Sequence, residues 1–257
     1  MSNQKKKVTS SFQKIQSISI LQLLEMHKVF IKYYHNADLQ TFITDMGKKT
    51  GVILLHDKQS KKIVGFSTWS ELEIINNGKK SIGIFSGDTV VEKEYWGNKA
   101  LHKTFVIELL KTKIKNPKVP VFWLLISKGY KTYLLLTNNF PKHYPSYKHN
   151  NIKLEAVVDN YCEQLYPAAY KKEDRVLDFG NQYQFLKDDV AQITDEMTSK
   201  DQNIDHFVKL NPSWHKGTEL PCVGEVSFHM MWSFVYKNVI SRKKRPLKDK
   251  TIMVNAS

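Results

Sequence analysis

The chain has 257 residues, with 41% hydrophobic and 25% charged side chains. These values are ordinary for a globular protein and exclude a largely disordered chain, and the length allows a substantial buried core. The longest uninterrupted apolar run, residues 121–126, is far shorter than the roughly 20 residues that a membrane helix needs. The polar N-terminus lacks the apolar segment of a secretory signal, so we expect a cytoplasmic protein without a membrane span.

The basic excess is an ambiguous guide to partners. The 39 lysine and arginine residues against 25 acidic residues give a net charge of +14, but only Arg175, Arg242 and Arg245 are arginine. Proteins that read nucleic acids usually rely on the two-pronged contacts of arginine, so a nucleic-acid partner is not favoured. A positive surface still attracts an anionic ligand or partner, and this alternative stays open.

Common catalytic and metal-binding motifs are absent from the sequence. There is no phosphate-binding P-loop, no G-x-S-x-G elbow, no H-E-x-x-H motif and no C-x-x-C pair. The two cysteines, Cys162 and Cys222, are too few for a disulfide framework or a closed zinc site, and His143 with His149 is a weak candidate pair. We therefore expect no metal cofactor.

The first part of the chain predicts two helices followed by an antiparallel meander. Apolar side chains three and four residues apart indicate an amphipathic helix over residues 20–37, and Asp38 is typical of the N-cap of a second helix that ends at Met46. From there the pattern changes to strands. The predicted strands cover residues 51–56, 63–74 and 81–91, with a hairpin turn at 76–78.

The third predicted strand contains an irregularity and leads into a helix. Gly87 in the strand interior is typical of a bulge, or of a place where a ligand approaches the backbone. A loop over residues 92–98 precedes a predicted helix over 99–115. Residues 121–127 form a continuous apolar run, which predicts a buried strand parallel to the third one because a helix connects the two. A further short helix is predicted over residues 130–138.

Beyond residue 140 we find no internal repeat and no flexible linker. The predicted elements are a helix over 152–170, a strand over 176–179, a helix near the end of 185–210, a strand over 220–228 and a helical face from Phe228 to Val239. We predict one domain over residues 14–240, with a core at 15–145 and an additional segment at 146–240. Residues 1–13 and 241–257 are predicted to be basic, flexible tails.

This order of elements resembles the GNAT superfamily of N-acetyltransferases over roughly residues 15–145. The resemblance implies an α/β fold with a mixed, mostly antiparallel sheet whose central parallel pair splays apart. It also implies that the pantetheine arm of acetyl-CoA or another acyl-CoA lies in the gap, with its pyrophosphate on backbone amides at the start of the next helix. The sequence YWGNKAL at residues 95–101 falls where the family has R/Q-x-x-G-x-G/A: Gly97 is kept, Trp96 replaces arginine or glutamine, and larger residues replace two small ones.

The resemblance also implies roles for individual residues. Acyl transfer to an amine needs a base for the ammonium proton, polarising amides and an acid for the leaving thiolate. Asp88 on the splayed strand is the candidate base, and Tyr130 and Tyr133 are candidate acids. The candidate donor-binding residues are Val90, Val91, Trp96, Gly97, Asn98, Lys99, Ala100 and Ser127. His102 in the following helix is more simply interpreted as an exposed helix residue.

We interpret the sequence as an acyltransferase that moves an acetyl or longer acyl group from a thioester to an amine of a small molecule. The changed loop leaves open whether the donor is acyl-CoA or an acyl carrier protein. The alternatives are a non-catalytic ligand- or protein-binding module on the same scaffold and, less favoured, a nucleic-acid binder that uses the basic tail. The additional C-terminal segment is expected over the acceptor side of the site.

Overall fold

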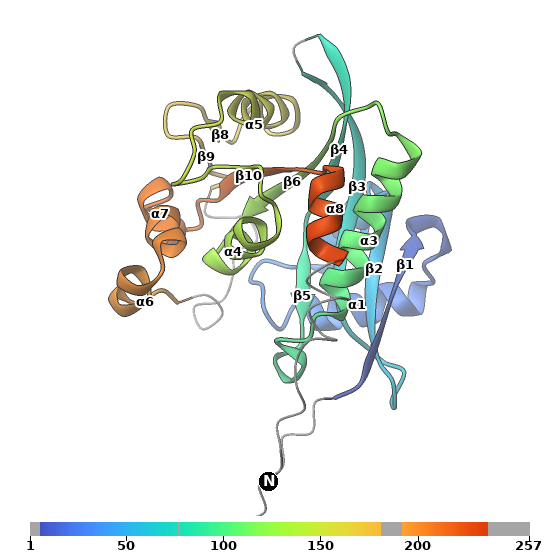
Figure 1. Ribbon diagram of the computed structural model, residues 1–257. Helices are drawn as coiled ribbons and strands as arrows, with labels where there is room; N and C mark the ends of the chain where they lie inside the picture. The colour runs from blue at the N-terminus through green and yellow to red at the C-terminus, as the bar shows by residue number, and fades with distance from the viewer. Residues whose placement is uncertain (1–5, 77, 181–191, 236–257) are drawn as a thin grey trace, which may run out of the picture.

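The computed structural model describes residues 6–76, 78–180 and 192–235. One eight-stranded sheet organises this part of the chain, in the order β1-β2-β3-β4-β6-β10-β7, with β5 paired to β3 (Figure 1). The strands of this sheet are β1 (Val8–Lys14), β2 (Gly51–Asp57), β3 (Ile63–Asn76), β4 (Lys79–Ser86), β5 (Thr89–Val91), β6 (Val121–Ser127), β7 (His143–Tyr144) and β10 (Leu220–Glu225). A separate two-stranded ribbon joins β8 (Tyr170–Lys171) and β9 (Val176–Leu177).

Helices cover both faces of the sheet. They are α1 (Ile20–Phe30), α2 (Leu39–Gly47), α3 (Ala100–Lys115), α4 (Tyr130–Asn139), α5 (Ile152–Leu165), α6 (Asp195–Lys200), α7 (Gln202–Leu210) and α8 (Phe228–Val235), with short 3-10 turns at η1 (Ile15–Ser17), η2 (Lys93–Tyr95) and η3 (Trp214–Lys216). Alternate side chains of a strand point to opposite faces. Along β6, Trp123 and Leu125 therefore pack with α3 and α4, whereas Phe122 and Leu124 pack with α5.

The remaining helices follow the same division. α1 and α2 pack against Phe66 of β3 and Val90 of β5, and the next buried hydrophobic even-numbered residue along β3, Ile74, joins the α5 side. α1, α2 and α5 thus share one face. Figure 1 shows α3 and α8 side by side on the other face, where the ammonium of Lys113 lies 5.7 Å from the ring centroid of Phe228.

The predicted fold class is confirmed. The sheet is mixed and mostly antiparallel, and its one parallel pair among the described strands is β4–β6. The crossover between these two strands contains α3, which ends at Lys115 as predicted, two residues before Pro117, since proline cannot continue a helix. Asp38 caps α2 as predicted, with its side chain accepting the N–H of Thr41 at 2.9 Å.

Several element boundaries differ from the predictions. The predicted helix over 20–37 ends at Phe30, because the chain turns there and Asn36 adopts a positive φ of 53°. Part of the predicted tail at residues 1–13 is strand β1, paired antiparallel with β2 from end to end. The predicted helix over 152–170 ends at Leu165. The predicted tail at 241–257 lies outside the described residues.

The single predicted third strand is two strands, β4 and β5, interrupted at residues 87–88. β4 pairs with the distal half of β3, whereas β5 pairs with its beginning. The C-terminal segment completes the sheet, because β10 inserts between β6 and β7. None of the helices in the described ranges combines the length and apolar character that crossing a membrane demands.

Candidate functional site

The sheet parts at the junction of β4 and β5. β4 and β6 are parallel neighbours up to the pair Ser86–Leu125. After Gly87 the chain continues in β5, which pairs with β3, and the N–H of Thr68 donates to the carbonyl of Asp88 at 3.0 Å. The hydrogen-bonded contact between the two central strands therefore ends at the glycine that the sequence singles out.

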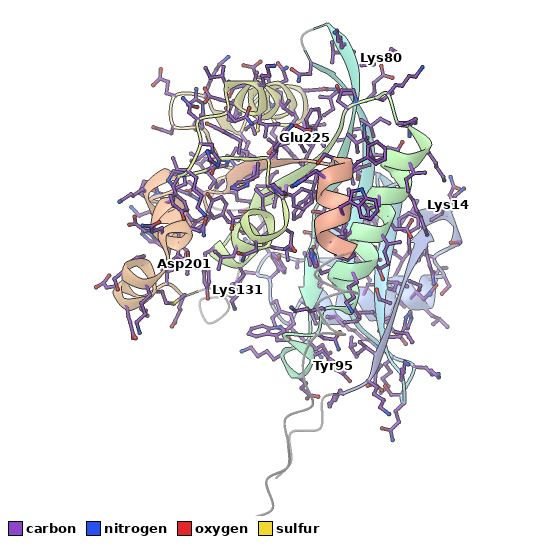
Figure 2. All side chains as sticks on the ribbon, in the orientation of Figure 1. Lys14, Lys80, Tyr95, Lys131, Asp201 and Glu225 are labelled. Atoms are coloured by element: carbon purple, nitrogen blue, oxygen red, sulfur yellow. The ribbon has the colours of Figure 1, made fainter. Side chains whose placement is uncertain are left out.

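A cavity of about 660 Å³ occupies this gap. Most of its walls come from β4 and β5, the loop before α3, the first turns of α3, the end of β6 and the start of α4. Further side chains come from the end of α2, the turn after α5 and the segment before β10. Tyr95 and Lys131, both labelled in the lower half of Figure 2, line the cavity from the turn before α3 and from α4. The predicted gap is thus open rather than filled by side chains.

The backbone of β5 presents a free edge to the cavity. Hydrogen-bonded pairs alternate with non-bonded pairs along an antiparallel ladder. Asp88 and Glu92 bond to β3 through their backbone groups, at 3.0 and 2.9 Å, so Val90 between them also faces β3. Thr89 and Val91 consequently turn their N–H and C=O groups away from β3, toward the gap. Of the two predicted amides, that of Val91 faces the cavity and that of Val90 does not.

Trp96 lies at the edge of the cavity and contacts the end of β5. Its indole Nε1 donates to the carbonyl of Val91 at 2.7 Å, and 44% of the residue is exposed. The ammonium groups of Lys131 and Lys93 lie 4.4 and 6.0 Å from its ring centroid, within the range of cation–π attraction. The family that the sequence resembles has arginine or glutamine at this position. In this chain the position holds an aromatic ring that lies near two lysines and donates a hydrogen bond to one carbonyl of the β5 edge.

The first turn of α3 offers backbone N–H groups. Gly97 has a φ of 76°, which glycine adopts without strain, and it turns the loop into the helix. The side chain of Asn98 accepts the N–H of Ala100 at 2.9 Å. Within the described residues the N–H groups of Lys99 and Leu101 make no hydrogen bond, and such groups at a helix N-terminus attract anions. Gly97 and Asn98 line the cavity, but Lys99 and Ala100 do not.

Asp88, the predicted base, lines the cavity at the opposite end of β5. The residue is half-buried. Burial raises the pKa of its carboxyl, and the ammonium groups of Lys128 and Lys49 partly oppose this rise because they favour the charged form. A carboxylate with a raised pKa is suited to take a proton from an ammonium group. Asp88 and the residues around it are called the inner end of the cavity below.

The inner end contains charged residues that the sequence analysis missed. The Nζ of Lys49, just after α2, is 2.8 Å from the carboxylate of Asp45. The Nζ of Lys128, just after β6, is 3.3 Å from the carboxylate of Glu219. Glu219 is only 3% exposed, and burial, opposed by Lys128, raises the pKa of its carboxyl to about 7. All four residues line the cavity.

Tyr166, which directly follows α5, also lines the inner end. Burial raises the pKa of its phenol, and the neighbouring carboxylates of Glu219, Asp45 and Asp88 add to this rise. Its ring packs against Phe85 at a centroid distance of 6.2 Å. Tyr166 is therefore a cavity tyrosine that stays protonated next to the predicted base.

The two tyrosines predicted as acids and Ser127 do not line the cavity. Tyr133 is fully buried, its hydroxyl donates to the carbonyl of Pro145 at 3.1 Å, and burial raises its pKa. Tyr130 packs against the core beneath α3 and α4. Ser127 is fully buried beside the thiol of Cys222, because alternation along β6 turns it to the opposite face from its neighbours. These three predicted roles have no support in the geometry.

His102 lines the cavity instead of lying exposed on α3, so its predicted exposure is wrong. Both ring nitrogens are buried, and neither has a hydrogen-bond partner within the described ranges. Burial lowers the pKa of the imidazole, although Asn139 lies close enough to oppose this. The neutral ring is therefore part of the cavity wall.

Comparison with solved structures finds proteins described as N-acyltransferases. A protein from Enterococcus faecalis, described as a probable N-acyltransferase of unknown function, is 15% identical at a TM-score of 0.39, over 51% of this chain and 32% of that one. YhbS from Escherichia coli, a GNAT family N-acetyltransferase in complex with CoA, is 10% identical at 0.34, over 48% and 64%. NAA60 from Arabidopsis thaliana, in complex with a bisubstrate analogue, is 13% identical at 0.39, over 52% and 87%.

The chain spans less than two thirds of the length of the first two of these proteins. No protein-family model matches the sequence, and no curated protein matches it. The parting of the central parallel pair, which is expected from the sequence, is present in the sheet, since β4 and β6 separate at Gly87.

Proposed function

We propose that the protein is an acyltransferase that moves an acyl group from a thioester donor to an amine of a small molecule. The observation that carries the proposal is the open gap after Ser86, where a cavity of about 660 Å³ runs along a free strand edge. A pantetheine arm is slender and contains amide groups, so it can pair with such an edge as an added strand does. The N–H groups of Thr89 and Val91 and the C=O of Thr89 are the partners that support this binding mode, since the C=O of Val91 accepts from Trp96.

The distribution of charge along β5 supports the same reaction. Near Trp96 lie Lys93, Lys131 and the N-terminus of α3, all of which favour the anionic part of a CoA or a carrier-protein phosphopantetheine. At the other end of β5 lies the carboxyl of Asp88. The donor and the acceptor thus enter environments of opposite charge, with the thioester between them.

The chemistry follows from these positions. Asp88 takes a proton from the acceptor ammonium, and the free amine then attacks the thioester carbon. The N–H of Val91 faces the gap and is the candidate donor to the oxygen on which negative charge develops. As the carbon–sulfur bond breaks, the nitrogen loses its second proton to give the amide, and the thiolate takes up a proton, for which the hydroxyl of Tyr166 is the candidate source. The proton released by the nitrogen restores the phenol, so that the net products are the amide, the free thiol and the proton held by Asp88.

A second candidate function is a non-catalytic binding module. It is favoured by two contacts that occupy groups a donor would use: Trp96 bonds to the carbonyl of Val91, and Asn98 bonds to the N–H of Ala100. In this alternative the cavity holds a ligand without turning it over.

One experiment separates the two functions. The purified full chain is mixed with acetyl-CoA or octanoyl-CoA, and its melting temperature and the release of free thiol in the presence of a mixture of primary amines are both measured. Acyl transfer predicts a raised melting temperature and thiol release that requires an amine. A raised melting temperature without thiol release favours the binding module, and no effect of any acyl-CoA or acyl carrier protein refutes the proposal.

A further inference from the structure

The inner end of the cavity contains more carboxylates than ammonium groups. The acidic side chains are those of Asp45, Asp88 and Glu219, and the basic ones are those of Lys49 and Lys128. Each lysine is within ion-pair distance of one acid, at 2.8 and 3.3 Å. Asp88 is the third carboxylate, and no ion pair reaches it from the described residues. The cluster therefore has one negative charge in excess when its groups are ionised.

These groups are held in place rather than spread over a solvated surface. The side chains of Lys49, Lys128 and Glu219 are 13%, 18% and 4% exposed, whereas that of Asp45, at the rim of the cluster, is 40% exposed. The backbone of Glu219 exchanges two hydrogen bonds of 2.9 Å with Leu177, which fixes its position just before β10. An excess charge in such a poorly solvated place costs free energy unless a counter-charge binds there.

A buried hydroxyl without a partner lies at the same place. Thr68 is 1% exposed, and its Oγ1 makes no hydrogen bond to any described residue. A Cβ on Gly87 would lie 2.9 Å from this oxygen and 3.9 Å from the Nζ of Lys49. The hydroxyl therefore lies behind the bulge between β4 and β5 and is not itself part of the cavity lining. Gly87, which does line the cavity, has no side chain to fill the space between this oxygen and the ammonium of Lys49.

We propose that Asp88 and Glu219 bind the ammonium group of the acceptor and that this subsite selects a cationic primary amine with no carboxylate beside the nitrogen. The proposal rests on the proposed acyl-transfer function and assigns the acceptor class to it. An ammonium group donates three hydrogen bonds, and the oxygens of the two carboxylates are acceptors for them.

The same geometry argues against other acceptors. An alcohol brings no positive charge, so the excess negative charge of the cluster stays uncompensated. An amino acid brings a carboxylate next to its ammonium group, and Lys49 and Lys128 are already paired with Asp45 and Glu219. The carboxylate of an amino acid therefore has to displace Asp45 or Glu219 from its lysine. Its negative charge also cancels the positive charge of the ammonium group, so the cluster keeps its excess negative charge.

The test compares acceptors that differ by one group. Propylamine is a simple cationic amine, 2-aminobutanoate is the same molecule with a carboxylate on the carbon that bears the nitrogen, and 1-propanol replaces the amine by a hydroxyl. With saturating acetyl-CoA, we expect kcat/KM for propylamine to be at least tenfold higher than for 2-aminobutanoate, and no thiol release above background with 1-propanol. Equal use of the amine and the amino acid, or preference for the amino acid, overturns the proposal.

Variants assign the effect to the subsite. Glu219→Gln should raise KM for propylamine at least tenfold, without changing the rise in melting temperature caused by acetyl-CoA. The matched control is Glu225→Gln, since Glu225 ends β10, the strand that Glu219 directly precedes, and pairs with Lys142 at 3.4 Å, outside the cavity. If acetyl-CoA binds but Glu219→Gln behaves as the control, the subsite is wrong. If acetyl-CoA does not bind at all, the acyl-transfer function itself is wrong.

Discussion

The buried carboxyl of Glu219 predicts a measurable dependence of stability on pH. Its pKa rises from 4.5 to about 7 in the folded protein, with burial as the main cause and Lys128 opposing it. Because the folded state binds this proton more tightly, the contribution is fully present below pH 4.5 and is lost as the pH rises through about 7. At 1.36 kcal/mol per pH unit, the loss amounts to about 3 kcal/mol, of which about 2.5 kcal/mol falls between pH 5 and pH 8.

The substitution Glu219→Gln removes the titrating group with little change of shape. We expect the free energy of unfolding of the variant, relative to that of the unaltered protein, to increase by about 2.5 kcal/mol from pH 5 to pH 8. Urea denaturation at the two pH values measures this difference. The substitution Asp88→Asn tests the electrostatic coupling between the carboxyl groups of Asp88 and Glu219, because the charge of Asp88 contributes to the raised pKa of Glu219.

A matched control is available on β10, the strand that Glu219 directly precedes. Glu225 is also paired with a lysine, but its side chain is 32% exposed, so Glu225→Gln should change stability by less than about 1 kcal/mol at either pH. If the relative stability of Glu219→Gln is the same at pH 5 and pH 8, Glu219 titrates alike in the folded and unfolded chain, and the enclosed inner end described above does not exist.

Three further predictions concern the gap. Asp88→Asn should lower kcat/KM for acyl transfer by about 10²- to 10⁴-fold while acetyl-CoA still raises the melting temperature, and the rate of the unaltered protein should increase with pH because the raised pKa of Asp88 must be exceeded before it acts as a base. Trp96→Phe frees the carbonyl of Val91 and should tighten acetyl-CoA binding by about two- to tenfold, as measured by calorimetry. Gly87→Ala places a methyl group 2.9 Å from Thr68 Oγ1 and should lower the free energy of unfolding by about 1–3 kcal/mol.

Each of these predictions has a control in the chain. Asp205→Asn alters a half-exposed carboxylate that pairs with Lys209 on α7, and it should leave acyl transfer unchanged. Trp232→Phe alters a tryptophan on α8 that is 69% exposed, and it should leave donor binding unchanged. Gly47→Ala adds a methyl group with no atom within 4 Å and should not destabilise the protein. If a control variant shows the same change as the variant with which it is paired, the corresponding prediction is contradicted.

The order of elements and the position of the gap were predictable from the sequence because they depend on local signals. Gly87 interrupts an otherwise regular strand, and the apolar run at 121–127 follows a helix, so both partners of the parallel pair could be located. The resemblance to the GNAT superfamily implies Asp88 as the candidate base, and it implies Trp96 and Gly97 as candidate donor-binding residues in the loop that precedes the helix.

The inner end was not predictable in the same way, because its residues are separated by long stretches of sequence. Lys49, Lys128, Tyr166 and Glu219 come from four segments, and no motif marks any of them. Lys128 alone carries a usable signal, since it directly follows the buried strand at whose end the gap opens. The sequence points to Ser127 instead, because the pattern predicts where β6 ends but does not predict the face of the sheet on which the side chain of Ser127 lies.

The insertion of β10 between β6 and β7 has a consequence for the way the protein becomes active (Figure 1). β6 is an interior strand, yet one of its two neighbours is synthesised about a hundred residues after it. Until that neighbour arrives, a long apolar strand has an open edge, which is a hazard for association with other chains. The same late strand brings Glu219 with it. A chain truncated before residue 219 therefore lacks both the closing strand of the sheet and the residue to which we assign recognition of the acceptor, so sheet closure and acceptor binding depend on one segment.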